Sequence, residues 1–292
     1  MKIAIIFTGG TISGGIQNGL ISPSQETKSE LIKALDEDIE VESFQPYYIL
    51  SEQLDGEYIS KLIKCVSECQ DVDGIIVTHG TDTLQYSAAA LSIAFGNSKI
   101  PIVLVSANYI LSDARSNGIS NFKYAVKFIR EKIGGVYVSY KNENGVPTIF
   151  FGDSLLPHLP YSDKLFSLTP PLGCYENEKF IKLTEDYKHS GEGVFTLSKK
   201  STVLWLKPYA GMNYPSVEGF KAVLLEAYHS GTLPTEDEDF INFCKNCGVP
   251  IYLTGLDEGV RYESAKSYNQ LNIVVLEKTS PIYAYISLWK DL

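Results

Sequence analysis

The feature that most constrains the fold is a short apolar run that ends abruptly in glycine and threonine, because it occurs twice. The first copy, "IAIIFTGGT", spans residues 3–11, and the second, "IIVTHGTDT", spans residues 75–83. Each apolar run predicts a buried strand, and the carboxyl ends of parallel strands meet at one edge of a sheet. Thr, Asp and Gly also cap helices and form tight turns. Two turns of near-identical design on one edge favour a ligand site over two separate caps.

Strand and helix signals alternate through the first half of the chain, which is typical of a parallel sheet covered by helices. The predicted strands are Lys2–Phe7, Ile39–Phe44, Gly74–Thr78, Ile100–Ser106 and Gly135–Tyr140. The predicted helices lie within residues 55–69, 83–95 and 117–130, where apolar residues recur at i, i+3, i+4 and i+7. We therefore expect an α/β protein with a larger N-terminal domain, built on a doubly wound, mostly parallel sheet.

The pattern weakens after Tyr140, where a hairpin turning at Asn144 and Gly145 precedes a proline-rich stretch. The polar segment "TEDYKHSGEG" then separates this stretch from a new strand. The predicted organisation is an N-terminal domain at 1–183, a linker at 184–200 and a smaller C-terminal α/β domain at 201–292. The elements expected in the last domain are strands at Val203–Leu206, Ala222–Glu226 and Ile251–Thr254, and helices at Thr235–Cys247 and Pro281–Trp289.

Composition limits the partners of the chain. The 292 residues include 25 basic and 35 acidic side chains, for a net charge of −10, so the basic surface of a nucleic-acid-binding protein is not expected. No apolar run approaches the roughly 20 residues of a membrane-spanning helix, and no secretory signal pattern precedes the first strand. We expect a cytoplasmic protein that binds a small polar molecule and neither nucleic acid nor membrane.

The five cysteines bear on metal and redox chemistry. An odd number favours reduced thiols over a disulfide framework. Cys65 and Cys69 are four residues apart on a predicted helix, and Cys244 and Cys247 form a CxxC pair. A zinc or redox site is one interpretation of these spacings, but buried cysteines that act as small hydrophobic residues are commoner. We therefore expect no metal and no cofactor.

The glycines of the first turn do not predict a nucleotide site. Gly9, Gly10, Gly14 and Gly15 follow a strand but lack the GxGxxG spacing, and no helical pattern begins directly behind them. The GK[ST] motif of a phosphate-binding loop is also absent from this region. The segment "GGIQNGLISPSQ", residues 14–25, is predicted to be a mobile loop.

Three motifs together resemble the bacterial-type L-asparaginase family of asparaginases and glutaminases. They are "TGGTIS" near the N-terminus, "THGTDT" about 70 residues later, and "SANYILSDARSNGISNFKYAV" at 106–126. A weaker resemblance continues through "EAYHSGTLP" and the last predicted helix, so it covers most of the chain. It implies a homodimer, often paired into a homotetramer, with sites at the dimer interface and no cofactor.

The resemblance also implies hydrolysis of the side-chain amide of asparagine, or sometimes glutamine, through a threonine nucleophile and a covalent acyl-enzyme. By position, Thr11 matches the nucleophile, while Thr81 and Asp82 match a second threonine and its carboxylate, which also holds the substrate ammonium. Backbone N–H groups around Gly10 and Thr81 are the expected donors to the oxyanion. The matched substrate-binding residues are Gly10, Ser51, Glu52, Gly80, Thr81, Asp82 and Ala107, and the neighbouring subunit is expected to lend Glu263 and His229.

This chain departs from the family pattern at three places. Glu52 replaces a common glutamine. The lysine that completes a Thr-Asp-Lys triad should precede Phe166 by about nine positions, but Pro157 stands there. The tyrosine expected on the loop after Thr11 is missing from "ISGGIQNGLISPS".

These departures leave three interpretations open. The first is an active amidohydrolase in which another cation or a water replaces the lysine. The second is a binding or regulatory protein that has lost turnover, and the third is an amidase for a related, modified or larger amide. Because acid-base assistance is worth about 10²- to 10⁴-fold in rate, we expect slow asparagine turnover with binding preserved. His79, within the second motif and next to the expected site, is expected to orient its loop rather than act as a base.

Overall fold

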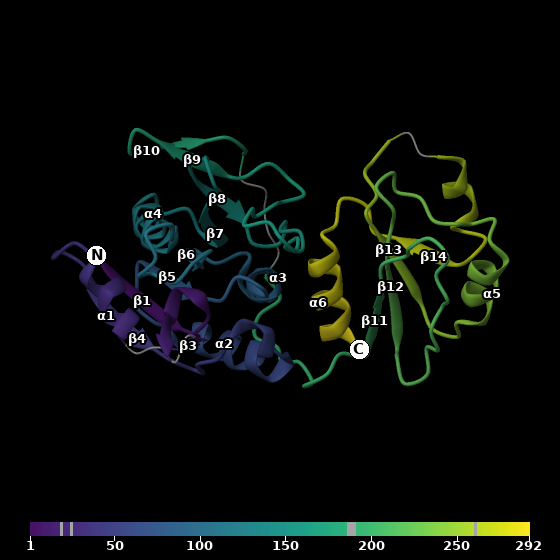
Figure 1. Ribbon diagram of the computed structural model, residues 1–292, viewed down its shortest axis with the longest axis horizontal. Helices are drawn as coiled ribbons and strands as arrows, with labels where there is room; N and C mark the ends of the chain where they lie inside the picture. The colour runs from purple at the N-terminus through teal and green to yellow at the C-terminus, as the bar shows by residue number, and fades with distance from the viewer. Residues whose placement is uncertain (18–19, 24–25, 186–190, 260–261) are drawn as a thin grey trace. The chain divides into compact units, whose positions relative to one another are not determined.

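The computed structural model describes residues 1–17, 20–23, 26–185, 191–259 and 262–292. It divides into two compact units, Met1–Lys199 and Lys200–Leu292, each with its own sheet (Figure 1). In the described parts of the chain, no helix combines the length and apolar character needed to cross a bilayer.

The first unit is built on an eight-stranded sheet in the order β10-β9-β8-β7-β6-β5-β1-β4. Five neighbouring strands are parallel: β1 (Lys2–Phe7), β4 (Glu40–Phe44), β5 (Gly74–Thr78), β6 (Pro101–Val105) and β7 (Gly135–Lys141). Three antiparallel strands extend the sheet: β8 (Pro147–Phe151), β9 (Gly173–Glu176) and β10 (Lys179–Lys182). The chain passes from β1 to β4 on one side and then returns to β5 on the other. The order of the strands therefore reverses between β1 and β5, which is where doubly wound sheets bind ligands.

Helices cover both faces of this sheet, which confirms the predicted doubly wound class. They are α1 (Glu26–Lys33), α2 (Gly56–Glu68), α3 (Leu84–Phe95) and α4 (Gly118–Arg130). One core contains Ile3, Ile5 and Phe7 of β1 together with side chains from α1 and α4. The alternate residues Ala4 and Ile6 are also fully buried, on the face where α3 packs against the sheet and α2 packs against α3 (Figure 1).

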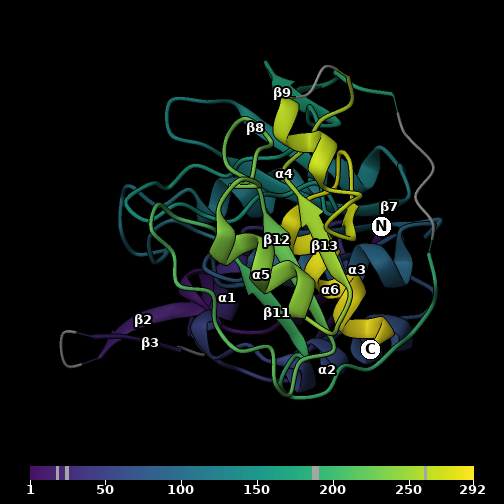
Figure 2. The ribbon, with the colours of Figure 1, turned by 90° about the vertical axis from the view of Figure 1, so that its right-hand side faces the viewer.

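The second unit has a parallel sheet in the order β11-β12-β13-β14. Its elements are β11 (Val203–Leu206), β12 (Ala222–Glu226), α5 (Glu238–Asn246), β13 (Ile251–Thr254), β14 (Ile273–Val275) and α6 (Pro281–Asp291). Within this unit α5 lies in front of the sheet and α6 behind it in Figure 2. The predicted helix at Thr235–Cys247 is shorter in the structure because Asp237 accepts a hydrogen bond from the backbone N–H of Phe240 and caps α5.

The segment predicted as a mobile loop at 14–25 forms a hairpin in its described part. Gly14–Gln17 (β2) pairs antiparallel with Leu20–Pro23 (β3). An Asn-Gly pair between two short strands is a strong hairpin signal, and here it is Asn18-Gly19. Residues 18–19 and 24–25 lie outside the described residues. The prediction of a loop was therefore wrong for the two strands.

The described part of the predicted linker packs on the first unit. The backbone N–H groups of Glu192 and Gly193 donate to the carbonyls of Ile93 and Ala94 in α3. Leu197 N–H donates to the Ser60 hydroxyl of α2 at 2.8 Å. Residues 186–190 of the predicted linker lie outside the described residues. The last residues of the predicted linker therefore lie against α2 and α3 of the first unit.

The cysteines are buried free thiols. Burial raises the pKa of Cys65 to about 11 and those of Cys69 and Cys244 to about 12. In the described residues, His, Cys, Asp and Glu side chains form no cluster of three or more that could hold a metal ion. The cysteines of both closely spaced pairs, Cys65/Cys69 and Cys244/Cys247, are thus protonated thiols packed inside the two units.

Candidate active site

The two glycine-threonine turns meet at the carboxyl edge of the first sheet. Phe7 pairs with Thr78 in register, so the loops after β1 and β5 start side by side. Gly10 has φ +74°, and a Cβ placed on it would lie 2.1 Å from the Cα of Gly80. A Cβ on Gly80 would lie 2.5 Å from the Ser51 hydroxyl oxygen. Only glycine permits such a close approach of two backbones, so these residues bring three loops together.

Hydrogen bonds to backbone carbonyls hold the first loop in place. The Thr8 hydroxyl donates to the carbonyl of Thr78 at 2.7 Å, and Ile49 N–H donates to the carbonyl of Thr8 at 3.0 Å. Gly10 N–H donates to the carbonyl of Ile49 at 2.9 Å. This N–H group was an expected oxyanion donor, but it is already occupied. In contrast, the N–H of Thr81 has no acceptor among the described residues and remains available to a ligand.

Thr11 begins a short 3₁₀ helix, η1 (Thr11–Ser13), directly after Gly10. Its side chain is partly exposed, whereas the neighbouring Gly10 and Ile12 are buried. The structure gives the Thr11 hydroxyl no hydrogen bond to any residue that it describes. The hydroxyl is thus held on a buried turn and is free to contact a bound molecule.

The second and third loops bring together four further predicted residues. Ser51 is buried at the start of η2 (Ser51–Gln53), and its hydroxyl donates to Asp82 Oδ2 at 3.3 Å. Thr83 donates to the Ser51 carbonyl at 2.8 Å, and Thr81 donates to the Ala107 carbonyl at 2.8 Å. Asp82 itself is exposed. A hydroxyl, a carboxylate and a second hydroxyl therefore line the edge beside Thr11.

The remaining predicted residues are Glu52, which follows Ser51, and two residues of the second unit. Glu52 belongs to η2, but its side chain is exposed. Glu263 and His229 belong to the second unit, where both are exposed and Glu263 pairs with Lys266 at 3.0 Å. Glu263 lies in η3 (Glu263–Ser267) and His229 follows β12. Within one chain these two residues are thus assigned to a different unit from the threonine loops.

His79 is fully engaged inside the second loop. Nδ1 lies 2.8 Å from the Gly80 carbonyl oxygen and Nε2 lies 2.8 Å from the Ser87 hydroxyl of α3. The side chain is buried, and burial lowers its pKa to about 4 despite the opposing hydrogen bond to the Gly80 carbonyl. With both nitrogens bound, this imidazole is not available to a substrate and orients the Gly80 turn.

Two side chains that the sequence analysis did not select lie near the site. His158 is half-buried in the segment after β8, and the Asp82 carboxylate acts on it electrostatically. Tyr48, which precedes the loop at Ile49, donates its hydroxyl to the Ser13 carbonyl at 2.9 Å. The signal for His158 was its place one residue after Pro157, where a lysine was expected. No periodic pattern points to Tyr48.

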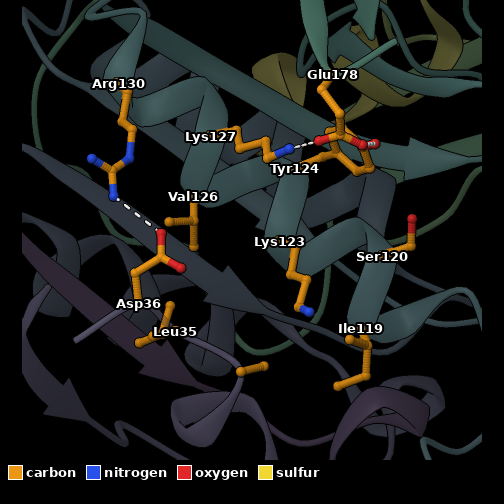
Figure 3. A pocket seen from close by; sticks show the side chains of 11 residues that line it. Leu35, Asp36, Ile119, Ser120, Lys123, Tyr124, Val126, Lys127, Arg130 and Glu178 are labelled. Carbon is orange, nitrogen blue, oxygen red and sulfur yellow. Dashed lines mark hydrogen bonds and ion pairs between the residues drawn. The ribbon is translucent and has the colours of Figure 1, made fainter. Parts of the chain in front are cut away.

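A separate hollow of about 540 Å³ lies along α4 (Figure 3). Several of its charged groups are paired with one another. Arg130 bonds Asp36 at 3.3 Å, and Glu178 pairs with Lys127 and accepts from the Tyr124 hydroxyl at 2.7 Å. It shares no residue with the threonine loops, so we do not include it in the candidate active site.

Comparison with known proteins agrees with the fold. The family described as "Asparaginase, N-terminal" matches residues 2–153, slightly more than half of the chain. Among curated relatives, a glutamyl-tRNA(Gln) amidotransferase subunit from Methanococcus maripaludis strain C7 is 27% identical, over 87% of this chain and 65% of that protein. The protein of the same name from Thermococcus kodakarensis is 27% identical, over 98% of this chain and 70% of its own length. The chain thus spans about two thirds of the length of these relatives.

Solved structures share the fold at low sequence identity. "The thermostable L-asparaginase from Thermococcus kodakarensis" matches with a TM-score of 0.83 at 21% identity, covering 99% of this chain and 92% of that chain. "Probable Cytoplasmic L-asparaginase from Campylobacter jejuni" matches with a TM-score of 0.76 at 23% identity, covering 99% and 94%.

A doubly wound unit with threonine-bearing loops at its switch point, followed by a smaller parallel α/β unit, is the two-domain asparaginase-type fold. The chain belongs to the asparaginase family.

Proposed function

We propose that this protein hydrolyses the side-chain amide of L-asparagine to aspartate and ammonia. Thr11 is the proposed nucleophile: its oxygen bonds to the amide carbon, ammonia leaves after taking up a proton, and water then releases aspartate from the acyl-enzyme. Thr81 and Asp82 are the proposed second threonine and carboxylate. The hydroxyl of Ser51 and the carboxylate of Asp82 are proposed to hold the carboxyl and ammonium groups of the substrate.

The observation that most supports this proposal is the contact between Gly10 and Gly80. It brings the backbone of the Thr11 loop against the loop that carries Asp82, whose carboxylate accepts from Ser51, at the switch point of the sheet. A hydroxyl nucleophile needs a base and a donor to the developing oxyanion. The free N–H of Thr81 is the proposed donor, since that of Gly10 is occupied.

A second candidate function is amide hydrolysis or transfer on a larger substrate. The curated relatives bear the name of a glutamyl-tRNA(Gln) amidotransferase component, and this chain spans only about two thirds of their length. A catalytically weakened protein that binds an amino acid is a third candidate, because the expected lysine is replaced. Ammonia release from free asparagine, free glutamine and peptide amides distinguishes these candidates, with aspartate titration as the measure of binding.

The net charge of the chain and its free thiols support a proposed location and proposed partners. We place the protein in the cytoplasm because its cysteines are free, as in reducing compartments. Its net charge of −10 favours neither nucleic acid nor an anionic membrane as a partner. A second copy of the chain, in a dimer or tetramer, is the proposed protein partner.

The first prediction concerns the nucleophile. Thr11→Ala should reduce ammonia release by several orders of magnitude, because no oxygen remains to form the acyl-enzyme. Mass spectrometry after rapid acid quench of the wild type with asparagine should detect a covalent adduct at Thr11, and the variant should show none. The unfolding midpoint should change little, since this hydroxyl makes no hydrogen bond to the described residues.

The matched control is Thr184→Ala, because Thr184 is also partly exposed and belongs to the same unit but follows β10. It should retain full activity. Substantial activity in Thr11→Ala would contradict the assignment of the nucleophile.

A further inference from the structure

The peptide group between Gly80 and Thr81 carries the proposed oxyanion donor, the N–H of Thr81. This peptide is trans, so its carbonyl and its N–H point in opposite directions within one plane. The Gly80 carbonyl oxygen lies 2.8 Å from Nδ1 of the buried His79 ring. The N–H of Thr81 therefore points away from that ring, and the group that holds the Gly80 carbonyl also sets the direction of the donor.

The hydrogen bonds of His79 determine which ring nitrogen carries the proton. A carbonyl oxygen can only accept a hydrogen bond, so Nδ1 donates to Gly80. The ring is neutral at pH 7 because burial lowers its pKa to about 4, and Nε2 of a neutral ring protonated on Nδ1 is an acceptor. The Ser87 hydroxyl lies 2.8 Å from Nε2 and donates to it. Both bonds thus fit one tautomer, and together they fix the orientation of the ring.

Ser87 comes from α3, the helix that begins directly after the second threonine loop. Its side chain is fully buried, and burying a hydroxyl costs free energy unless the hydroxyl is hydrogen-bonded. The structure gives this hydroxyl one partner among the described residues, Nε2 of His79. The next three residues of the helix, 88–90, are buried alanines, so α3 packs here without hydroxyl groups. The contribution of the Ser87 hydroxyl is therefore its bond to the imidazole.

Close contacts fix the position of the Gly80 turn from its other sides. A Cβ on Gly10 would lie 2.2 Å from the Gly80 nitrogen, and a Cβ on Gly80 would lie 2.5 Å from the Ser51 hydroxyl oxygen. The Thr81 hydroxyl donates to the Ala107 carbonyl at 2.8 Å. Glycine adopts more backbone conformations than other residues, so the rotation of the peptide plane at Gly80 needs a restraint of its own. The bond from Nδ1 of the buried imidazole supplies it.

We propose that His79 and Ser87 are positioning residues for the oxyanion donor. Ser87 fixes the imidazole ring, and the Nδ1–H group of the ring fixes the Gly80–Thr81 peptide with its N–H turned outward from the buried side. The inference rests on the proposed function. Because both side chains are buried, they act through the Gly80 carbonyl and not by touching the substrate.

The role of this pair in the reaction is to hold one dipole still. When the Thr11 oxygen bonds to the amide carbon, the electron pair of the carbonyl bond moves onto the amide oxygen. The proposed donor to that oxygen is the N–H of Thr81, and such a donor is effective when its direction is set before the charge develops. No proton passes to or from His79 in this step. Loss of the pair should therefore slow the chemical step without weakening binding of the ground state.

The kinetic test uses two amides that differ by one methylene. In His79→Asn the amide nitrogen can take the place of Nδ1 and donate to Gly80, whereas in His79→Gln the amide group reaches the place of Nε2. His79→Gln should lose about 10²-fold in kcat, as expected for a catalytic contact misplaced by roughly 1 Å. His79→Asn should retain most of the wild-type kcat. The affinity of both variants for aspartate, measured by calorimetry on folded protein, should be unchanged.

The contribution of Ser87 is tested inside α3. Ser87→Ala should lower kcat, and Ser87→Thr, which keeps the hydroxyl, should restore it. Ser92→Ala is the matched control, because Ser92 is another buried serine of α3 and its hydroxyl donates to the Ala88 carbonyl at 2.8 Å. This control should leave kcat unchanged.

A further measurement does not depend on turnover. ¹⁵N NMR of the His79 ring at neutral pH should show Nδ1 protonated and Nε2 unprotonated. A proton on Nε2, equal kcat in His79→Asn and His79→Gln, or an equal loss of kcat in Ser87→Ala and Ser92→Ala would each overturn the inference. A change in aspartate affinity in place of kcat would overturn it as well. A wild type that hydrolyses no amide would instead contradict the proposed function, and would remove the oxyanion role even with the proton on Nδ1.

Discussion

At the scale of single residues, His79 links the stability of the site to pH. Its pKa falls from 6.5 to about 4 because the ring is buried. Between pH 4 and pH 6.5 the unfolded chain binds a proton at this imidazole that the folded chain does not bind. The contribution of His79 to the free energy of unfolding is therefore fully present above pH 6.5, and it is lost as the pH falls towards 4. The pKa difference corresponds to about 3 kcal/mol.

The second prediction follows from this linkage. Urea unfolding of the wild type at several pH values should show stability falling between pH 6.5 and 4, and His79→Gln should lose much of that slope. Ser87→Ala removes a bonding partner of the ring but retains the imidazole, so it should keep the slope. Equal slopes in the wild type and His79→Gln would assign the pH dependence to other groups.

Single residues also show which parts of the site can be predicted from the sequence. Residues 45–50 separate Ser51 from the end of β4, and its predicted role came from the family resemblance. The place of Gly10, Thr11 and Gly80 at the sheet edge was predictable, because their loops follow the buried strands β1 and β5. His158 was not, because its distance from Asp82 depends on the path of an irregular, proline-rich segment. That path is determined by the hydrogen bonds of Asn142 and Tyr140, which are distant in sequence.

At the scale of elements, the buried parallel strands were the most predictable. The predicted bounds of β1 and β5 agree with the structure, because these strands are continuous apolar runs followed by turn residues. The hairpin of β9 and β10 was not predicted. It turns at Asn177 and Glu178, both with positive φ, and an Asn-Glu pair is a much weaker turn signal than Asn-Gly.

The third prediction concerns α2, which begins directly after the η2 turn that contains Ser51. Asp55 Oδ1 accepts from the backbone N–H groups of Glu57 and Tyr58 at 3.0 and 3.1 Å. Asp55→Ala should therefore lower the free energy of unfolding by about 1 kcal/mol, measured by urea denaturation. Asp55→Asn retains a good cap and should cost much less. Equal losses in the two variants would show that charge, rather than capping, stabilises this end of the helix.

At the scale of the whole molecule, the residues predicted to come from a neighbouring subunit share one end of the second unit. Glu263 lies in η3, which is followed by Tyr268, and the Tyr268 hydroxyl donates to the Gly231 carbonyl at 2.8 Å. His229 belongs to the turn that contains Gly231. These two exposed residues therefore lie on loops that are attached to each other, and they are a candidate surface for completing a site in a second copy.

The fourth prediction is that the active protein is at least a dimer with shared sites. Light scattering should show no active monomer. Each site would take Thr11 from one protomer and Glu263 from the other. Thr11→Ala and Glu263→Gln should therefore each impair activity. Glu263→Gln does so by weakening a charged hydrogen bond worth about 1.5–3 kcal/mol. Mixing the two variants after reversible dissociation should restore about one quarter of wild-type activity, since half of the dimers are then mixed and each contains one intact site.

The control mixes Thr11→Ala with Glu258→Gln, because Glu258 is another exposed glutamate of the second unit. That mixture should behave as Thr11→Ala diluted with wild type, which tests whether recovery depends on Glu263. A stable, fully active monomer, or no recovery on mixing Thr11→Ala with Glu263→Gln, would confine the site to one chain and exclude both Glu263 and His229 from it.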